Sequence, residues 1–563
     1  MKEHNICMFQ FLLVCYVQYV ACGDPELVAY YNRTDPAARQ LWEFKNTHPE
    51  PIGLLTTGSG KLVDIRETVA INSDPFSNLY NVDIITQLNA ERVPERVVHA
   101  KGTAAFGYFE VTHDVSKYTK ADVFNGIGKK TPLVARFSTV LQSLGGADAS
   151  REMKGLAVKM YTNEGNLDFL CINFPTYFYR DANDFLHFVH SFKRNPKTDL
   201  PDFTSAFDFI TKRPDSFHGF LWFLSDFGIP NGYRKMDSFP VHTYVINNKK
   251  RERYFVRFSF RSEQGVENLS SEDAREISSR DPNYFNRDLY NAIEEKNYPA
   301  WRLEMDLMTY DQIKKVDYNP FEVTRSWKKG TYKTVPIGRL VLDRNPDNNF
   351  AVSEQSTFSP ARLVPGIPGP IDTMFRTRRQ SYRDAQSYRM SINHNKIEVN
   401  APKYSKNYLR DGKPPVGENG RDAPNYYPNS FNGPIPYVDA DLPKERLSLL
   451  ESNAVDLEPA ATFYNDLLNC QERERLANNS APLLAVVPPF MQRRMLKLFT
   501  LVDVDLGRRV TESLEKFLRT PPPPPPKPLI PSEKYYKQQQ QTKKKKSRNE
   551  QNKPTATEEC YRH

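Results

Sequence analysis

Residues 96–102 read RVVHAKG and residues 106–114 read FGYFEVTHD, and this stretch decides the fold assignment. The first segment, RVVHAKG, places His99 among apolar neighbours, with the permanent cation Arg96 three residues earlier. An imidazole in a dry pocket can accept and return a proton near neutral pH, as a general acid or base does. Most lone histidines are instead core residues with satisfied hydrogen bonds, so the function of His99 depends on the sequence around it.

Five further motifs follow this stretch in order, and together they are more specific than any one of them. They are GKKTPLVARFSTV (128–140), GLAVKMYT (155–162), LDRNPDNNFA (342–351), MFRTRRQSYRDAQSYR (374–389) and APNYYPNSF (423–431). With RVVHAKG they resemble the haem catalases of the smaller-subunit animal type over residues 45–520. The resemblance implies an enzyme that decomposes hydrogen peroxide to water and oxygen, with haem b as its iron cofactor, assembled as a homotetramer.

The resemblance also implies an α+β catalase fold, an antiparallel eight-stranded β-barrel with an N-terminal arm, a wrapping loop and a C-terminal helical domain. The alternation in YFVRFSF at 254–260 agrees, since it is typical of an antiparallel strand with one buried face. Residues 401–455 are rich in Pro, Asn, Asp and Gly and indicate the wrapping loop. Helical spacing returns in residues 456–520, at Met495, Leu496, Leu498, Phe499, Val510, Leu514 and Phe517.

We divide the chain into six segments on this basis. They are a signal peptide (1–22), an N-terminal arm (23–90), the β-barrel haem domain (91–400), the wrapping loop (401–455), the helical domain (456–520) and a Pro-rich, Lys-rich tail (521–563). The apolar run from Ile6 to Cys22 predicts the signal peptide. A membrane anchor is the alternative, but Gln10 and Gln18 interrupt a run that is short for a span.

The two ends of the chain favour secretion. The last five residues, ECYRH at 559–563, are not a peroxisomal signal, and the leader directs the chain to the secretory route. Three cysteines lie outside the leader, which is too few for a disulfide framework. We therefore expect a secreted protein whose fold depends on its core.

Most of the net charge belongs to the tail. The formal charge is +9, and residues 527–563 hold ten Lys or Arg and four Glu, or +6, which leaves +3 for the rest. A nearly balanced body excludes a nucleic-acid-binding field across it. The tail composition, with Pro521–Pro526 and Lys543–Lys546, predicts disorder. Either it is solvated and has no partner, or the lysines retain the protein on anionic glycans or an anionic surface.

Arg378 and Tyr382 are the candidate ligand pair for the iron. They lie four residues apart, which places them on one side of a helix. A neighbouring guanidinium favours the phenolate form of a tyrosine, and a phenolate is a good ligand for ferric iron. The spacing alone is common and mostly structural; within the motif at 374–389 it matches the axial ligand of the family.

The resemblance assigns further residues to the haem. His242 and Asp372 match residues that hydrogen-bond the arginine beside the ligand tyrosine, and Arg389 matches a position that lines the same pocket. Arg96 and Arg136 match residues that neutralise the haem propionates, a role suited to a bidentate guanidinium.

On the opposite, distal side of the haem, His99 matches the catalytic imidazole and Ser138 the hydroxyl that orients it. The resemblance implies that the imidazole moves a proton between the two oxygens of peroxide. The apolar walls that keep this side dry match Val98, Val140, Phe178 and Phe185.

The distal side departs from the family at the position of its catalytic asparagine. The family has Gly-Asn-Asn-x-Pro, whereas residues 171–175 read CINFP, so Ile172 replaces the catalytic asparagine and Asn173 matches its neighbour. Losing one neutral hydrogen bond costs about 1–3 kcal/mol, or about 10- to 100-fold in a rate that it governs. Glu152 also replaces a channel aspartate. We expect reduced catalase activity.

Two alternatives follow from this departure. One is a haem protein of peroxidase character or weak catalase activity, and the other is a secreted binding or immunomodulatory protein on a catalase scaffold. We do not expect NADPH to bind. His218, Ser225 and Trp327 match its contacts in some relatives, but Phe227 replaces an arginine and Lys329 a histidine.

Overall fold

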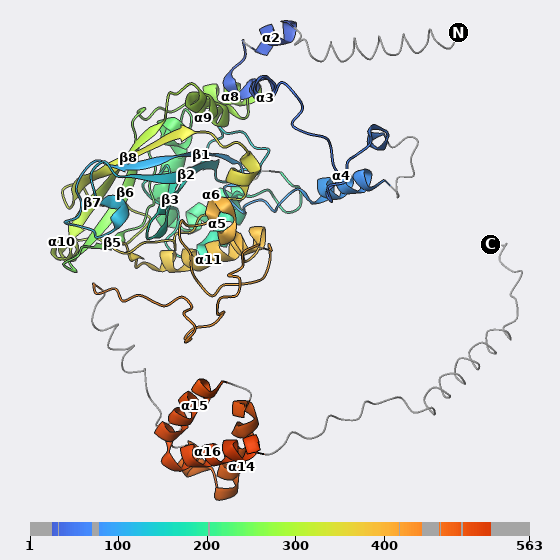
Figure 1. Ribbon diagram of the computed structural model, residues 1–563. Coiled ribbons are helices and arrows are strands. Elements are labelled where there is room, and N and C mark those ends of the chain that lie inside the picture. Colours follow the sequence, from blue (N-terminus) through green and yellow to red (C-terminus); the bar gives the residue numbers. More distant parts are fainter. Residues whose placement is uncertain are drawn as a thin grey trace, which may run out of the picture. The chain divides into compact units, whose positions relative to one another are not determined.

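The computed structural model describes residues 25–31, 33–69, 78–200, 203–415, 417–441, 461, 463–485 and 488–519. The expected signal peptide and the expected tail lie outside these residues. The chain divides into two compact units, residues 1–442 and 443–563, and each is described by itself (Figure 1). In the described part of the chain no helix is long and apolar enough to cross a bilayer.

A curled antiparallel sheet forms the centre of the first unit, with the hydrogen-bonded order β4-β3-β2-β1-β8-β7-β6-β5-β9 (Figure 1). The strands are β1 (Gly102–Val111), β2 (Lys130–Thr139), β3 (Lys154–Thr162), β4 (Gly165–Ile172), β5 (Tyr244–Asn247), β6 (Arg253–Ser262), β7 (Ala300–Thr309), β8 (Lys333–Arg344) and β9 (Gly369–Pro370). Eight of them have 4 to 12 residues, and β9 adds a two-residue edge. The predicted antiparallel α+β catalase fold is confirmed.

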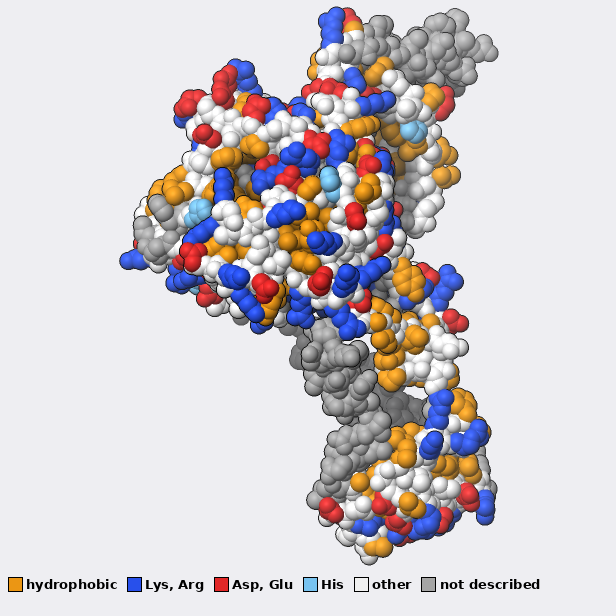
Figure 2. All heavy atoms as spheres, turned by 90° about the vertical axis from the view of Figure 1, so that its left-hand side faces the viewer, with side chains coloured by type: hydrophobic (Ala, Val, Ile, Leu, Met, Phe, Trp, Pro, Cys, Tyr) orange, Lys and Arg blue, Asp and Glu red, His pale blue; other side chains and the backbone are white. Residues whose placement is uncertain are grey.

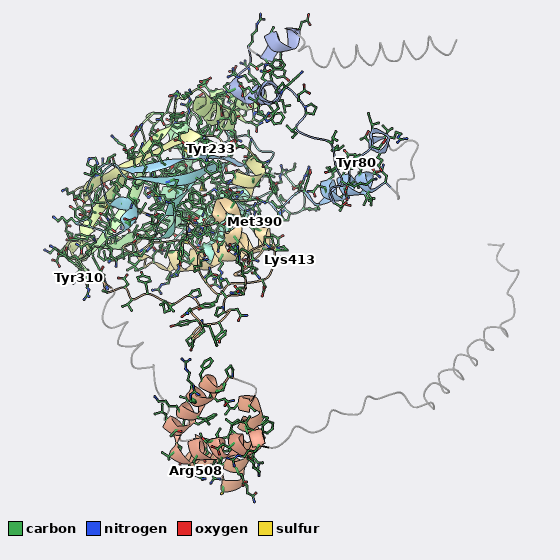
Figure 3. The ribbon with its side chains drawn as sticks, in the orientation of Figure 1. Tyr80, Tyr233, Tyr310, Met390, Lys413 and Arg508 are labelled. Carbon is green, nitrogen blue, oxygen red and sulfur yellow. The ribbon has the colours of Figure 1, made fainter. Side chains whose placement is uncertain are left out.

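Aromatic contacts bring the two ends of this sheet together. The Phe169 ring on β4 lies 6.1 Å from the ring of Tyr244 on β5, and 5.1 and 5.7 Å from those of Phe258 and Phe260 on β6. Because β4 begins the sheet order and β5 and β6 lie near its end, the sheet encloses its core. Tyr233 is fully buried beside the sheet (Figure 3).

Strand β6 is buried on both faces, although its alternation predicts only one buried face. Residues Phe255–Phe260 are all buried. Val256, Phe258 and Phe260 belong to the barrel core, whereas Phe255 packs with Trp327 in a second cluster. The segment around Trp327, which follows β7 in the chain, covers the outer face of β6. The alternation within a strand cannot predict which later segment will cover that strand.

Helices cover the barrel from outside and form much of the arm. They are α5 (Asp184–Phe192), α6 (Phe203–Lys212), α7 (Phe217–Leu224), α8 (Ser271–Arg280), α9 (Tyr284–Glu294), α10 (Tyr310–Lys315) and α11 (Thr373–Met390), with α2 (Pro25–Tyr31), α3 (Gln40–Thr47) and α4 (Leu79–Ala90) in the arm. Asp372 caps α11, since its carboxylate accepts a hydrogen bond from the Phe375 amide at 2.8 Å. The helix ends at Ser391, whose φ is 67°.

The second unit contains the predicted helical region. Its helices are α14 (Cys470–Ala485), α15 (Pro489–Val502) and α16 (Val504–Arg519). Ala481, Leu506, Val510 and Leu514 form the buried core between them. Phe517, which the helical spacing also selects, is instead exposed.

Candidate active site

A cavity of about 480 Å³ lies on the outer face of β2, β3 and β4. Two rows of paired residues run across these strands beneath it, Arg136–Ala157–Leu170 and Ser138–Gly155–Ile172. Paired residues of antiparallel strands point to the same face, and all six line the cavity. The alternate residues, such as Phe137 and Leu156, belong to the barrel core. The strand period therefore directs these six side chains to the cavity, whereas Leu156 and Cys171, which also line it, belong to the core cluster.

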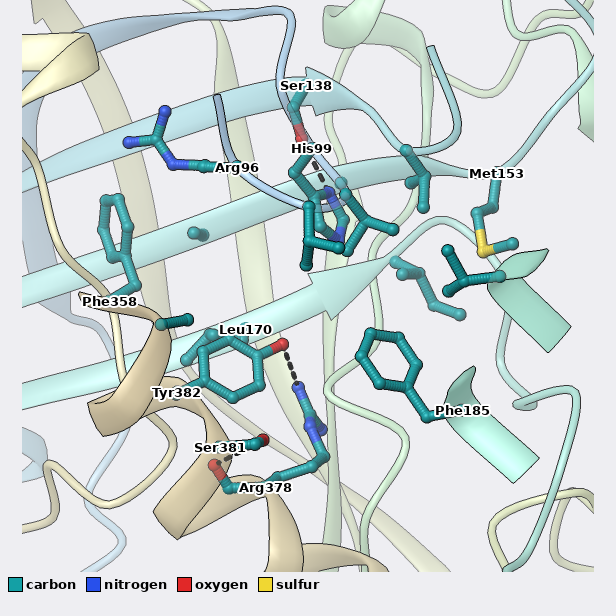
Figure 4. A pocket seen from close by; sticks show the side chains of 18 of the residues that line it. Arg96, His99, Ser138, Met153, Leu170, Phe185, Phe358, Arg378, Ser381 and Tyr382 are labelled. Carbon is teal, nitrogen blue, oxygen red and sulfur yellow. Dashed lines mark hydrogen bonds between the residues drawn. The ribbon is translucent and has the colours of Figure 1, made fainter. Parts of the chain in front are cut away.

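His99 is held above the second row by its backbone and its ring. Its backbone lies in the left-handed region, with φ 65°, and Arg136 fixes it by donating to the carbonyls of His99 and Ala100, each at 2.9 Å. The ring Nδ1 lies 2.9 Å from Ser138 Oγ (Figure 4). Gly155 leaves room for the ring, because a Cβ there would lie 2.6 Å from Nδ1.

His99 is a neutral imidazole in this environment. Burial lowers its pKa to about 3, with further contributions from the charges of Arg136, Arg96 and Arg378. A neutral ring has one nitrogen free to accept a proton. With Nδ1 donating to Ser138, that nitrogen is Nε2, and His99 can serve as a base.

Ile172 lies at the end of the same row, beside Gly155. Its side chain packs with Val140, Met153 and Phe178, and it is 7% exposed. Two backbone hydrogen bonds to Phe239, of 3.0 and 2.8 Å, hold it in place. An apolar side chain therefore occupies the wall next to the imidazole.

Asn173 directs its amide away from the cavity. Its Oδ1 accepts a hydrogen bond from the Lys154 amide at 2.8 Å, and its Nδ2 donates to the Phe227 carbonyl at 2.8 Å. Both ends of this buried amide are occupied, so Asn173 does not supply a donor beside His99.

A chain of hydrogen bonds leads through α11 to Tyr382. Asp372 Oδ2 lies 3.0 Å from His242 Nδ1, and His242 Nε2 lies 2.7 Å from Arg378 Nη1. Arg378 Nη2 donates to the Tyr382 hydroxyl at 3.1 Å, the last bond of the chain (Figure 4). Burial lowers the pKa of His242 despite the Asp372 carboxylate, so the ring is neutral, with Nδ1 donating and Nε2 accepting.

Arg378 holds a positive charge against the Tyr382 oxygen. Burial by itself would lower the pKa of Arg378, but the phenol oxygens of Tyr382 and Tyr177 raise it above its ordinary value. A fixed cation beside a phenol stabilises the phenolate. The pair can therefore offer the Tyr382 oxygen, with a guanidinium beside it, as a ligand to a hard cation such as ferric iron.

Three arginines surround one carboxylate at another side of the cavity. Arg96, Arg136 and Arg389 lie 3.7, 3.9 and 3.8 Å from Glu354. Burial, followed by the charges of Arg136 and Arg389, lowers the pKa of Arg96 well below its ordinary value. Among the described residues, Nη1 of Arg96 and Nη1 of Arg389 have no hydrogen-bond partner. This excess positive charge suits a ligand that carries two carboxylates.

The other predicted wall residues also line the cavity. They are Val98, Val140, Phe178 and Phe185. Glu152, which the sequence predicts in the channel, instead accepts hydrogen bonds from the amides of Val140 and Leu141 and from the Ser150 hydroxyl. Its carboxylate thereby fixes the strand end beside His99.

Sequence reasoning missed several residues of the site. Met153, Tyr177 and Tyr179 line the cavity, and Glu354 joins the three arginines. Tyr177 and Tyr179 flank the predicted Phe178, so adjacency could have indicated them. For Glu354 the signal is electrostatic, because three buried arginines require an acidic neighbour.

Among the residues that match NADPH contacts in some relatives, His218 bonds neighbouring groups of this chain, and Trp327 is buried, with its Nε1 donating to the Pro320 carbonyl at 2.8 Å. His218 Nδ1 lies 2.9 Å from the Thr324 carbonyl, and Trp222 Nε1 donates to His218 Nε2 at 3.4 Å. The Trp222 ring lies 4.8 Å from the ring of Phe227.

Comparisons with known proteins agree with this arrangement. The sequence profile of the family described as Catalase matches residues 69–433, and that of Catalase-related immune-responsive matches residues 456–514. Catalase of Drosophila melanogaster is 41% identical over 499 residues, which cover 85% of this chain and 98% of the relative. Catalase of Sus scrofa is 40% identical over 497 residues, covering 86% and 94%.

Solved structures show the same similarity. A bacterial catalase is 31% identical, with a TM-score of 0.67 over 85% of this chain and 99% of the other. Catalase A from Saccharomyces cerevisiae is 32% identical, with a TM-score of 0.65 over 82% and 99%.

Proposed function

Because the chain belongs to the catalase family, whose members are haem enzymes that decompose hydrogen peroxide, we propose that its cavity binds haem b and works at a reduced rate. The observation that carries the reduced rate is Ile172, an apolar side chain beside the catalytic imidazole.

The cavity suits haem at two places. The surplus charge and unpartnered nitrogens of Arg96 and Arg389 match the two propionates. The Tyr382 oxygen, paired with Arg378, would hold the ferric iron. Bound haem would supply the redox-active iron that exchanges electrons with peroxide.

His99 performs the proton transfer in this proposal. Its neutral Nε2 takes a proton from one oxygen of the peroxide and returns it to the other, which becomes water. Ser138 keeps the ring oriented through Nδ1. The apolar walls, including Val98, Phe178 and Phe185, exclude bulk water from the transfer.

Ile172 offers no hydrogen bond to the second oxygen of the peroxide. The missing bond costs about 1–3 kcal/mol, or about 10- to 100-fold in rate. The intact chain from Asp372 to Tyr382 favours an enzyme over the alternative of a secreted binding or immunomodulatory protein on a catalase scaffold.

The test combines spectroscopy with oxygen evolution on the purified full chain. We expect a Soret band and slow oxygen release, and a gain of about 10- to 100-fold in kcat/KM for Ile172→Asn. Ile172→Val, which keeps an apolar side chain at this position, serves as the control and should bring no gain. Absence of the Soret band would refute the haem enzyme, and an unchanged Ile172→Asn variant would refute the assignment of position 172.

Catalases are typically tetrameric, and exposed apolar side chains support a homotetramer of this chain. Helix α4 has no buried residue, and Leu79 and Leu88 on it are 55% and 60% exposed. In the wrapping loop Ile435 and Val438 are 81% and 77% exposed. Figure 2 shows apolar side chains among the charged ones on one face. Large apolar side chains exposed together on one element, as on α4, support contacts with other chains.

Secretion and a role for the tail belong to the same proposal. The leader at 1–22 and the Lys543–Lys546 cluster support them from sequence alone. Deletion of residues 527–563 should abolish retention on heparin at low salt, whereas unchanged retention would exclude a tether to anionic glycans. We also propose that NADPH is not a cofactor, since Phe227, whose ring packs at a tilt against Trp222, stands where an anion-binding arginine would be needed.

A further inference from the structure

We infer that the cavity favours small organic hydroperoxides, ROOH, over hydrogen peroxide. This inference rests on the proposed function and names the substrate class of the same site. It depends on which polar groups near His99 are still free to bond a substrate.

Most polar groups near the imidazole are already bonded. Ser138 Oγ is 2.9 Å from His99 Nδ1, which leaves Nε2 as the ring atom for the substrate. The Asn173 amide is bonded at both ends to Lys154 and Phe227. The Glu152 carboxylate is bonded to backbone amides and Ser150. None of these three side chains can hold the far end of a peroxide.

The wall around the imidazole is otherwise apolar. Ile172 follows Ser138 and Gly155 in one row across the strands, so it lies on the same face as the residue that holds His99. Val140, Met153, Phe178 and Phe188 pack with it in one cluster. Leu141 and Phe185 pack against that cluster. An atom beyond the one bonded to His99 therefore meets carbon and sulfur.

Hydrogen peroxide and an organic hydroperoxide differ at that outer atom. Hydrogen peroxide carries an O–H group at each end, and its outer O–H is desolvated against Ile172 without a partner. In ROOH the inner O–H still bonds His99, and the alkyl group replaces the outer O–H. The exchange removes an unpaired polar group and buries an apolar one. It therefore raises kcat/KM for ROOH relative to kcat/KM for hydrogen peroxide by about 10- to 100-fold.

Two phenols are the alternative hydrogen-bond partners for the outer oxygen of the peroxide. Tyr177 and Tyr179 line the cavity, and the Tyr179 hydroxyl donates to that of Tyr177 at 3.1 Å. The hydroxyl hydrogen of Tyr177 is not used in that bond. The experiment therefore includes Tyr177→Phe.

The reaction balances with a small reductant of the same shape. The O–O bond of ROOH breaks and ROH leaves with the proton that His99 returns to it, and bound haem would supply the two electrons of the cleavage. The second oxygen leaves as water with the two protons of the reductant. A short primary alcohol gives up those two electrons and two protons and becomes an aldehyde. The sum is hydroperoxide plus primary alcohol to alcohol, water and aldehyde. The primary alcohol also has one polar end and one apolar end.

The first measurement is the ratio of kcat/KM for ethyl hydroperoxide to that for hydrogen peroxide, in the haem-loaded full chain. We expect Ile172→Asn to lower this ratio by about 10- to 100-fold, because an amide can bond the outer O–H. Ile172→Val keeps an apolar wall and is the matched control, with a ratio within about threefold of the parent. An equal ratio in parent and Ile172→Asn overturns the inference.

The second measurement is an equilibrium one. 1-Propanol and ethylene glycol have the same number of heavy atoms and differ by a methyl for a hydroxyl at the far end. Their dissociation constants are measured from the shift of the haem absorption band. In the parent chain the constant for 1-propanol should be smaller than that for ethylene glycol, and the difference should be smaller in Ile172→Asn. Equal constants in the parent chain overturn the inference.

The outcomes separate this inference from the proposed function. A chain without a Soret band that turns over neither peroxide refutes the proposed function and the inference with it. A chain that releases oxygen from hydrogen peroxide but has an unchanged ratio in Ile172→Asn refutes only the inference. If Tyr177→Phe raises the ratio by tenfold or more, the Tyr177 hydroxyl receives the outer oxygen, and the apolar wall does not set the preference.

Discussion

At the scale of single residues, Gly155 decides where the imidazole can lie. A Cβ at this position would be 2.6 Å from His99 Nδ1 and 2.7 Å from Ser138 Oγ. Neither neighbour is the end of a flexible chain, because His99 is held by its backbone and Ser138 by the sheet. The smallest possible side chain thus preserves the bond that orients the catalytic ring.

We predict that Gly155→Ala displaces the imidazole and breaks its bond to Ser138. Activity should fall by at least about tenfold, because a positioned acid or base usually contributes more than that to the rate. The Soret band should be retained. Oxygen evolution and the absorption spectrum measure the two effects. Gly145→Ala is the control, because a Cβ at Gly145 has no atom within 4 Å. Unchanged activity in Gly155→Ala would contradict the packing described here.

The buried imidazole also determines the response to pH. Its pKa is lowered to about 3 in the folded chain, against about 6.5 in the unfolded chain. The base is therefore neutral throughout the range from neutral pH to about pH 5. We predict that kcat/KM has no acid limb due to His99 between pH 8 and pH 5, measured by initial rates of oxygen release. A limb near pH 6.5 would contradict the buried, neutral state.

Linkage gives the sign of the corresponding change in stability. Below about pH 6.5 the unfolded chain binds a proton at His99 that the folded chain does not bind. The free energy of unfolding therefore falls as the pH falls from about 6.5 toward 3. His99→Gln should flatten this part of the curve, as chemical denaturation at several pH values would show.

At the scale of elements, helix α11 carries the Arg378–Tyr382 pair, and Asp372 joins the helix to the site. One carboxylate oxygen caps the helix at the Phe375 amide and the other bonds His242. Burial, the largest single effect, raises the pKa of Asp372, but the hydrogen bonds from His242 and the Phe375 amide outweigh it, so the pKa is lowered. The same carboxylate thus starts the helix and orders the hydrogen bonds that end at Tyr382.

We predict that Asp372→Ala lowers the free energy of unfolding by about 1–3 kcal/mol, because the cap and a buried hydrogen bond are both lost. Asp372→Asn keeps a side-chain oxygen that can cap the helix, so its free energy of unfolding should fall by less. Gln380→Ala, an exposed change on the same helix, is the control and should stay within about 0.5 kcal/mol. Equal stabilities of Asp372→Ala and the control would contradict the double role of Asp372.

At the scale of the whole molecule, the barrel unit presents apolar surface that one chain does not bury. Helix α4 has apolar residues and no buried position. The largest of its exposed side chains are Leu79, Ile84, Ile85 and Leu88. Exposed apolar area of this kind costs free energy in water unless another chain covers it.

We predict that Ile85→Asp combined with Leu88→Asp reduces the size of the assembly. Two charges on this face oppose its burial against another copy. Light scattering at matched concentration should give a smaller mass for the variant than for the parent chain. Gln87→Asp adds charge at an exposed polar position of the same helix and should leave the mass unchanged. A common mass for all three proteins would contradict an interface through α4.

Much of the fold and of the site could be predicted from the residues themselves. The spacing of Arg378 and Tyr382 places them together on α11, because helical neighbours four apart share a face. Ordered motifs such as RVVHAKG identify the family and with it the barrel. Glu354 escaped prediction, since the three arginines beside it are brought near only by the folded chain.

The sequence by itself determined the family, the antiparallel barrel and the substitution of isoleucine at position 172, because motifs and register are properties of chain order. Only the tertiary structure decided what that substitution means. Ile172 shares a row with Ser138 and Gly155, whereas the neighbouring Asn173 bonds Lys154 and Phe227 outside the cavity. Successive side chains of a strand point to opposite faces. Ile172 therefore faces the cavity beside His99, whereas Asn173, one residue later, directs its amide away from the cavity.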